Sequence, residues 1–279
     1  MHVFRSDWEP APRAAPPGAT LLAIGDVHGC PAQLDAMLAV LAEVVDDARR
    51  RGRRAELVML GDYVDRGPDS PGVLRRLPDI GRRLEPEVPV HLLLGNHDEL
   101  LLDRLGEPPD PAALGHWLRR GGSRLPGMTP APDLVAPPTD EEQPDLATLA
   151  ALLSGLASHR VIGDYVFAHA GIAPDRPLAA QTLDDLLWIR EPFLDATDWP
   201  HGFAVVHGHT PQGPEVLPHR VGVDSGCFFT GVLTAVQIED RRLRFHAVSA
   251  DPEPLEFREL IEASGQRRRF AGPTPLPGS

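Results

Sequence analysis

Polar side chains that can bind metals and move protons follow five short apolar runs in this chain. Each run stops abruptly at glycine and polar residues, as in "LLAIGDVHG" (21–29) and "VHLLLGNHD" (90–98). The polar residues at these positions are Asp26, His28, Asp62, Asp65, Arg66, Asn96, His97, His169 and His209. Carboxylate, amide and imidazole groups, with no cysteine among them, suit manganese, iron or zinc in a reactive site better than a structural zinc site.

This set of ligands suits a site with two metal ions. Two metals about 3.5–4 Å apart can share a carboxylate, and sites of this kind hydrolyse phosphate esters. Asp62 lies in the second of the first three loops and is the natural shared ligand. Asp26 and His28 are two residues apart, so both can point the same way from an extended loop. Asn96 offers a carbonyl oxygen that adds no charge. The adjacent His97 cannot easily share the geometry of that metal and is free to face a substrate.

The elements that carry these residues alternate between strands and helices. Short apolar runs bounded by glycine are typical of strands buried on both faces. Apolar residues recur every three or four positions in "AQLDAMLAVLAEVVDDARRRG" and predict a helix over 32–52. Further helices are expected over 70–84, 98–105, 146–157 and 181–194, with three strands after residue 210. The pattern indicates an α/β fold, in which ligands bind at the carboxyl ends of the strands.

The chain is expected to form one catalytic domain over residues 20–250. Residues 106–144 are rich in proline and acidic residues and predict an insertion, and no role follows from the sequence for its part 121–144. The Pro-rich residues 1–19 are expected to form an irregular lead-in. Residues 262–279 are expected to be a disordered tail.

Composition excludes several classes of partner. The 279 residues carry a formal net charge of −13, which argues against a general affinity for nucleic acid or for an anionic membrane. No apolar run approaches the roughly 20 residues that span a bilayer, and the first residues lack the pattern of a signal peptide. The two cysteines, Cys30 and Cys227, suit a reducing compartment, so a cytoplasmic location is expected. The sequence does not indicate whether either cysteine has a redox role.

Five motifs occur in a fixed order: "GDVHG", "GDYVDRG", "GNHD", "HAG" and "GHT". Together they resemble the calcineurin-like metallophosphoesterases, over about residues 20–236. The complete "GDYVDRG" and the "WIRE" at 188–191 are similar to the phosphoprotein phosphatase branch of that family, especially its bacterial serine/threonine phosphatases. The resemblance implies a four-layer sandwich of two mixed β-sheets flanked by helices. A dinuclear metal site would lie at the carboxyl ends of the strands.

The resemblance also implies a ligand set for each of two metal ions. The first metal would be held by Asp26, His28 and Asp62, and the second by Asp62, Asn96, His169 and His209. The expected metals are manganese paired with manganese or iron, with zinc, nickel or cobalt as alternatives. Each residue taken alone could instead be an ordinary loop or cap residue, because Asp and Asn favour turns and helix N-termini.

Four further residues would act on the substrate. The resemblance implies that His97 protonates the leaving oxygen and that Asp65 orients His97. It also implies that Arg66 and Arg190 hold the phosphate. A carboxylate partner is needed to keep an imidazole charged near two metals, and the planar fork of arginine suits phosphate. Arg190 could instead pair with a neighbouring acid such as Glu191 at the end of a helix.

The sequence thus predicts hydrolysis of phosphomonoesters by direct attack of a hydroxide that bridges the metals. The leading substrate is a phosphoprotein, at serine or threonine and possibly also tyrosine. The alternative is a nucleotide hydrolase of the symmetrical diadenosine tetraphosphate hydrolase type, so a phosphorylated small molecule stays open as substrate. A metal-binding interaction module without activity is a third hypothesis. The physiological substrate and the oligomeric state do not follow from the residues.

Overall fold

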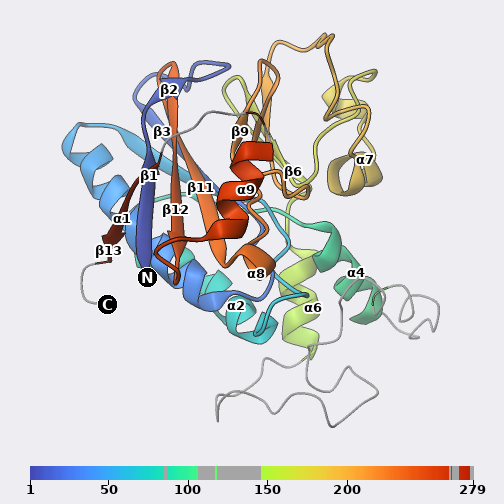
Figure 1. Ribbon diagram of the computed structural model, residues 1–279. Coiled ribbons are helices and arrows are strands. Elements are labelled where there is room, and N and C mark those ends of the chain that lie inside the picture. The colour runs from blue at the N-terminus through green and yellow to red at the C-terminus, as the bar shows by residue number, and fades with distance from the viewer. Residues whose placement is uncertain (85–86, 106–116, 118–145, 264, 266–269, 277–279) are drawn as a thin grey trace.

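The computed structural model describes the chain except for residues 85–86, 106–116, 118–145, 264, 266–269 and 277–279. The Pro-rich insertion expected at 106–144 therefore lies outside the described residues, apart from Trp117. In the described part, two β-sheets lie face to face with helices on their outer faces (Figure 1).

The larger sheet has eight strands in the order β13-β1-β12-β11-β3-β4-β5, with the short β2 paired to β12. Strands β3, β4 and β5 are parallel to one another, whereas β11 pairs antiparallel with both β3 and β12. The sheet is therefore mixed. Its strands are β1 (His2–Ser6), β2 (Glu9–Pro10), β3 (Ala19–Ile24), β4 (Arg54–Met59), β5 (Val90–Leu92), β11 (Val232–Glu239), β12 (Arg242–Ser249) and β13 (Phe270–Pro275).

The smaller sheet has five strands in the order β6-β7-β8-β10-β9. Its central strands β7, β8 and β10 are parallel, and the edge strands β6 and β9 are antiparallel to their neighbours. The strands are β6 (His159–Ile162), β7 (Tyr165–Ala168), β8 (Ala204–His207), β9 (Glu215–Val216) and β10 (Arg220–Gly222).

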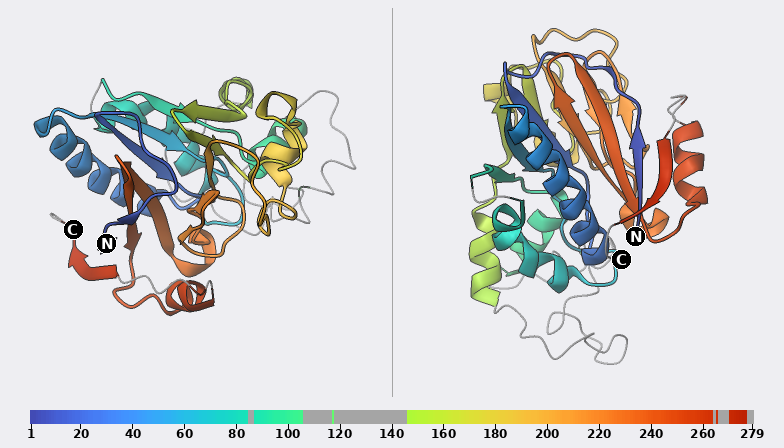
Figure 2. Two further views of the ribbon diagram at one scale, coloured as in Figure 1. Left: turned by 90° about the horizontal axis from the view of Figure 1, so that it is seen from above. Right: turned by 90° about the vertical axis from the view of Figure 1, so that its left-hand side faces the viewer.

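Alternating side chains of the strands build the successive layers of the core. In β3, Leu21 faces the smaller sheet and contributes to the cluster between the sheets, whereas Leu22 belongs to the cluster under the helices. In β7, Phe167 faces the larger sheet, and Val166 packs on the opposite side with Leu186 of α7. This alternation follows from the two-residue period of a strand and yields the expected four-layer sandwich of helices, two mixed sheets and a further helix (Figure 2).

Helices cover both outer faces of the sandwich, and the last one packs against Val232 and Ala247 on the face of the larger sheet that also carries the smaller sheet. The helices are α1 (Pro31–Arg50), α2 (Ser70–Arg76), α3 (Ile80–Leu84), α4 (Asn96–Leu105), α6 (Leu146–Ser154), α7 (Leu183–Trp188), α8 (Cys227–Thr230) and α9 (Leu255–Ala263), with 3-10 turns at Leu77–Asp79 and Leu178–Ala180. Helix α1 matches the predicted helix over 32–52. The helix predicted over 181–194 ends earlier, because Ile189 leaves the helical conformation. None of the described helices combines the length and apolarity needed to cross a membrane.

Both ends of the chain are more regular than the sequence predicts. Residues 1–19 were expected to be irregular, but His2–Ser6 form β1, which pairs with β12. Residues 262–279 were expected to be a disordered tail, but Phe270–Pro275 form β13 at the edge of the sheet beside β1. These pairings join segments far apart in the chain, so local composition gave no sign of them.

The loops that carry the five motifs follow β3, β4, β5, β7 and β8, at the carboxyl ends of parallel strands. The described residues other than glycine that have a positive φ are His28, Asp62, Asp65, Arg66, His209 and Asp240. All but Asp240 are in these loops and are predicted site residues. Residues other than glycine rarely adopt a positive φ, because this backbone conformation is strained. Backbone strain of this kind concentrates at functional sites.

Glycine permits a close approach between the second and third loops. A Cβ atom on Gly95 would lie 2.1 Å from the backbone nitrogen of Asp62 and 2.2 Å from its Oδ1 atom. Both of these atoms belong to the residue at the centre of the site, so neither can move freely.

We predict that Gly95→Ala destabilises the fold by about 1–3 kcal/mol or more, the usual cost of overpacking, because the clash involves backbone. The free energy of unfolding measured in urea checks this. Gly202→Ala is the matched control, since a Cβ there meets nothing within 4 Å, and its stability should change by no more than about 0.5 kcal/mol. Equal stability of the two variants would contradict the close approach.

Candidate metal centre

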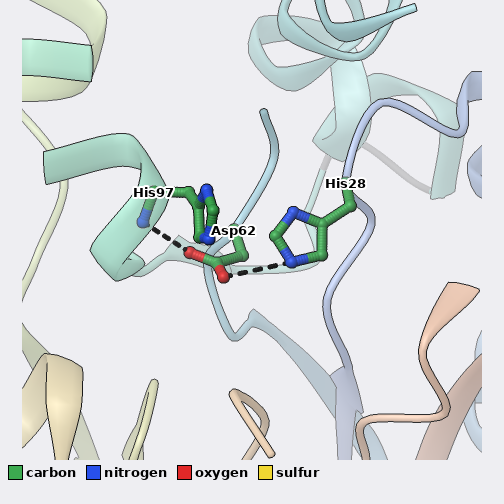
Figure 3. A group of neighbouring side chains, drawn as sticks. All are labelled: His28, Asp62 and His97. Atoms are coloured by element: carbon green, nitrogen blue, oxygen red, sulfur yellow. Dashed lines mark hydrogen bonds and ion pairs between the residues drawn. The ribbon is translucent and has the colours of Figure 1, made fainter. Parts of the chain in front are cut away.

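Asp62 lies at the centre of the site, with imidazole groups beside both of its carboxylate oxygens. Its Oδ2 atom is 3.3 Å from Nε2 of His28, and its Oδ1 atom is 3.5 Å from Nε2 of His169. The Oδ1 atom also accepts a hydrogen bond of 2.9 Å from the backbone N–H of His97. Figure 3 shows the carboxylate between His28 and His97. These contacts bring residues from three other motif loops to one carboxylate.

Two groups of residues could each hold a metal ion, and they share Asp62. His28, Asp62 and His97 form one group, and Asp62, His169 and His209 form the other; in each, the candidate ligand atoms lie within 4.8 Å of one another. All five side chains are buried. A single carboxylate common to two groups is the geometry that a pair of bridged metals requires.

Backbone carbonyls fix the orientation of two of the histidines. Nδ1 of His28 is 2.8 Å from the carbonyl oxygen of Val64, and Nδ1 of His169 is 2.9 Å from that of Leu60. A carbonyl only accepts hydrogen bonds, so in each ring Nδ1 carries the proton and donates it. The lone pair is then on Nε2, the nitrogen that faces Asp62, as is usual for histidine ligands of metals.

The amide predicted as a neutral ligand lies beside the second group. Oδ1 of Asn96 lies 2.9 Å from Nε2 of His169 and 3.1 Å from Nδ1 of His209. Burial and the charge of His169 lower the pKa of His209 to about 2, and burial lowers the pKa of His169 as well. Both rings are therefore neutral near pH 7, which is the form that binds a metal.

Asp26 belongs to neither of the two groups, although the sequence places it with His28 and Asp62. Its carboxylate accepts a hydrogen bond from the backbone N–H of His209, at 3.0 and 3.2 Å from the two oxygens. The chain is close enough there that a Cβ on Gly208 would lie 2.0 Å from Oδ1 of Asp26. Asp26 thus joins the first loop to the last, and direct ligation by Asp26 stays a prediction.

His97 has a buried partner on one side and none on the other. Its Nδ1 atom is 2.8 Å from Oδ2 of Asp65. Its Nε2 atom is buried and has no hydrogen-bond partner among the described residues. An unpartnered buried polar atom carries a free-energy cost and calls for an explanation. A leaving group or a metal at Nε2 would supply one.

Trp117 supports Asp65 and was not identified from the sequence. Its Nε1–H donates to both carboxylate oxygens of Asp65, at 3.1 and 3.0 Å, and the indole is fully buried. Trp117 lies within the Pro-rich insertion, 52 residues away from Asp65 in the chain. No local pattern links the two residues, so only the tertiary structure reveals the contact.

Asp98 also has a larger role than the sequence suggests. The sequence predicts only that a helix begins at this position, and Asp98 does lie in the first turn of α4. The side chain is fully buried. Its carboxylate accepts hydrogen bonds from the backbone N–H groups of Asp62, Tyr63 and Gly95, at 2.8, 3.0 and 3.0 Å. Asp98 therefore holds together the two loops that meet at Gly95.

The two predicted phosphate-binding arginines differ in position. Arg66 is half-buried at the site, with Nη1 3.0 Å from Nε2 of His28. Arg190 is exposed, just beyond the end of α7, and its positive charge is one of those that lower the pKa of His209. The structure thus brings Arg66 into contact with a site residue and places Arg190 at the exposed side.

The site contains more buried negative charge than its arginines balance. Burial and the charges of Asp224 and Asp62 raise the pKa of Asp26 well above its usual range. Burial and the charge of Asp62 raise the pKa of Asp98 to about 8, and burial raises that of Asp224. Buried carboxylates that repel one another are stabilised by cations, so the residues present fit divalent metals, with ligand atoms of the type preferred by manganese, iron and zinc.

The chain belongs to the calcineurin-like phosphoesterases, because the model of that family matches residues 19–232. It is a metal-dependent phosphoesterase, and therefore a hydrolase, with the fold that the motifs predict.

Among similar proteins, several are named as nucleotide hydrolases. The asymmetrical bis(5'-nucleosyl)-tetraphosphatase PrpE of Bacillus velezensis is 26% identical over 257 residues, which cover 85% of this chain and 96% of that protein. The symmetrical bis(5'-nucleosyl)-tetraphosphatase of Edwardsiella ictaluri is 31% identical over 275 residues, covering 80% of this chain and 94% of that protein.

Solved structures show the same fold. The crystal structure of a proposed diadenosine tetraphosphatase superimposes with a TM-score of 0.53 at 25% identity, covering 81% of this chain and 94% of that chain. A mutant of a cold-active protein tyrosine phosphatase gives a TM-score of 0.52 at 18% identity, covering 84% of this chain and 81% of that chain. At this identity the second likeness concerns the fold alone.

We predict that metal ions raise the melting temperature of the protein, because they bind the folded site and neutralise its buried carboxylates. Differential scanning calorimetry after chelation, and again after addition of manganese, measures the effect. His169→Ala should bind less metal and show a smaller increase, whereas His91→Ala, outside the site, should respond as the wild type does. Identical melting temperatures with chelator and with metal would contradict a metal centre.

Proposed function

We propose that the protein hydrolyses bis(5'-nucleosyl) tetraphosphates, using water to break one phosphoanhydride bond. The observation that carries the proposal is a metal site with a shared carboxylate, in a chain that aligns over 80% and 85% of its length with two enzymes named for this activity. The motifs predict a phosphoprotein phosphatase as the first hypothesis and a nucleotide hydrolase of this kind as the alternative. The relatives favour the alternative.

The proposed ligands divide between two metal ions that share Asp62. His28 belongs to the first, with Asp26 nearby, and Asn96, His169 and His209 belong to the second. The bound metals would supply a water of lowered pKa and positive charge beside the phosphate oxygens. We propose manganese, paired with manganese or iron, because the ligands are oxygens and imidazoles without thiolates.

The protein's own residues bind the phosphate chain and move a proton. Arg66 and Arg190 hold phosphate oxygens, and their planar guanidinium groups can each make two hydrogen bonds. His97 donates the proton on Nε2 to the leaving oxygen, while Asp65 accepts from Nδ1–H and holds the ring in place. Trp117 fixes the carboxylate of Asp65 in turn. Asp65 and Trp117 therefore act as positioning residues for His97.

A protein phosphatase remains a second candidate, and one contact favours it. The alkoxide released from phosphoserine is strongly basic and depends on a proton as it departs, whereas a nucleotide phosphate is a weaker base and gains less from one. The buried pair of His97 and Asp65 is a proton donor of the kind that a basic leaving group requires. The tyrosine phosphatase with a similar structure adds no support, since its likeness concerns the fold alone.

We predict a higher kcat/KM for diadenosine tetraphosphate than for a phosphoserine or phosphotyrosine peptide with the manganese-loaded enzyme. Chromatography of the products separates symmetrical cleavage, which yields two molecules of ADP, from asymmetrical cleavage, which yields AMP and ATP. Asp62→Asn is the control for contaminating hydrolases, because it removes charge from the shared ligand. Turnover of the phosphopeptides without cleavage of the dinucleotide would overturn the proposal and favour a protein phosphatase.

We predict that His97→Ala lowers kcat by roughly 10²–10⁴-fold, the range for one acid or base group, with metal content retained. The loss should be larger for an alkyl phosphate than for p-nitrophenyl phosphate, whose leaving group needs little help from an acid. Metal analysis accompanies the kinetics, because His97 also lies in one of the two groups that could hold a metal.

His91→Ala is the matched control, since His91 pairs with Glu56 outside the site, and its kcat should match that of the wild type. Trp117→Phe keeps an aromatic ring but removes the N–H that donates to Asp65, so its loss of kcat should be smaller than that of His97→Ala. Loss of metal from His97→Ala would show that His97 is a ligand rather than the proton donor.

A further inference from the structure

We propose that Phe229 stacks against a nucleobase of the substrate and so gives the site its preference for nucleotides over other phosphate esters. The inference rests on the proposed function and goes beyond it by assigning a binding surface for the base. The metal ligands, the arginines and His97 account for the phosphate and the leaving group. None of them offers a flat apolar surface.

Phe229 is an exposed aromatic residue close to the metal site. The large hydrophobic residues exposed in the described part of the chain are Val161, Leu183, Phe229 and Leu255, and Phe229 is the aromatic one, at 47%. Single exposed apolar side chains are ordinary on a protein surface. The position of Phe229 is what distinguishes it.

A series of ring contacts leads from a metal-group histidine to Phe229. The ring of His28 lies 5.4 Å from that of Phe228, with the planes nearly perpendicular. The ring of Phe228 lies 5.0 Å from that of Phe229. Phe229 is therefore one aromatic ring beyond the residues that line the first metal group, and its own ring is exposed to solvent.

The proposed phosphate-binding arginine lies on the same side. The guanidinium carbon of Arg66 is 5.0 Å from the centre of the Phe228 ring, in a cation–π contact, while its Nη1 atom reaches His28. A phosphate held by Arg66 would thus have its ribose beside Phe228. The base, one ribose farther from the phosphate, would reach Phe229.

The backbone holds the Phe229 ring in position. The ring packs over Gly226, where a Cβ would lie 2.1 Å from Cε1 of Phe229. Gly226 has a φ of 65°, and its N–H donates to Oδ1 of Asp224 at 2.8 Å. One face of the ring is therefore supported by the chain. Nucleobases stack on such supported aromatic rings through their π faces, with little regard to base identity.

The test measures binding of adenosine monophosphate and of ribose 5-phosphate to the manganese-loaded protein by titration calorimetry. The two ligands share ribose and phosphate, so the ratio of their dissociation constants reports the contribution of the base. We expect the wild type to bind adenosine monophosphate more tightly. Phe229→Ala should weaken that binding by roughly 5- to 150-fold, the value of one base–aromatic stack, and leave ribose 5-phosphate binding close to the wild-type value.

Two further variants separate stacking from general effects. Phe229→Trp preserves an aromatic face and should retain the preference for adenosine monophosphate. Leu255→Ala removes a more exposed apolar side chain from α9 and should leave both dissociation constants unchanged.

Equal weakening of both ligands by Phe229→Ala, or no weakening of either, would overturn the inference. A loss confined to phosphopeptide turnover would also overturn it, and would assign Phe229 to a protein substrate. Failure of the wild type to cleave diadenosine tetraphosphate removes the proposed function itself. Cleavage by the wild type with unchanged adenosine monophosphate binding in Phe229→Ala removes only the role of Phe229.

Discussion

The structure of the site depends on the carboxylate of Asp62, which lies within reach of histidines from both candidate metal groups. Its charge would be costly in a fully buried position without cations beside it. Asp98 holds the loop that carries Asp62 through two backbone hydrogen bonds, and Gly95 allows the neighbouring loop to contact it directly. The position of the Asp62 carboxylate is thus set by the packing of the backbone around it rather than by the choice of side-chain rotamer.

The same constraint explains why strain is concentrated in the motif loops. Parallel strands of two facing sheets deliver five loops to one place, and their polar side chains must then turn toward a common centre. His28, Asp62 and His209 do so from a left-handed backbone conformation. Each such residue costs free energy, which the buried strands and the sandwich core offset. Metal ions that neutralise the buried carboxylates would add to that compensation.

Much of the site could be predicted from the sequence because its residues lie in short motifs at strand ends. The α/β class follows from the strand-end pattern, and the resemblance that the five motifs carry implies the mixed sheets and the grouping of Asp62 with His28, His169 and His209. The contact of Trp117 with Asp65 could not be predicted, since it joins residues 52 positions apart through a segment without a clear pattern. Strand β13 was missed for a similar reason. It owes its order to β1, whose sequence lies at the other end of the chain.

The nature of the substrate depends on residues outside the five motifs, but the central claim concerns Asp62 and two metals. Anomalous diffraction from crystals of the manganese-loaded protein tests it most directly. The account predicts two manganese peaks about 3.5–4 Å apart, with the Asp62 carboxylate between them. A single peak, or two peaks that do not share Asp62, would contradict it.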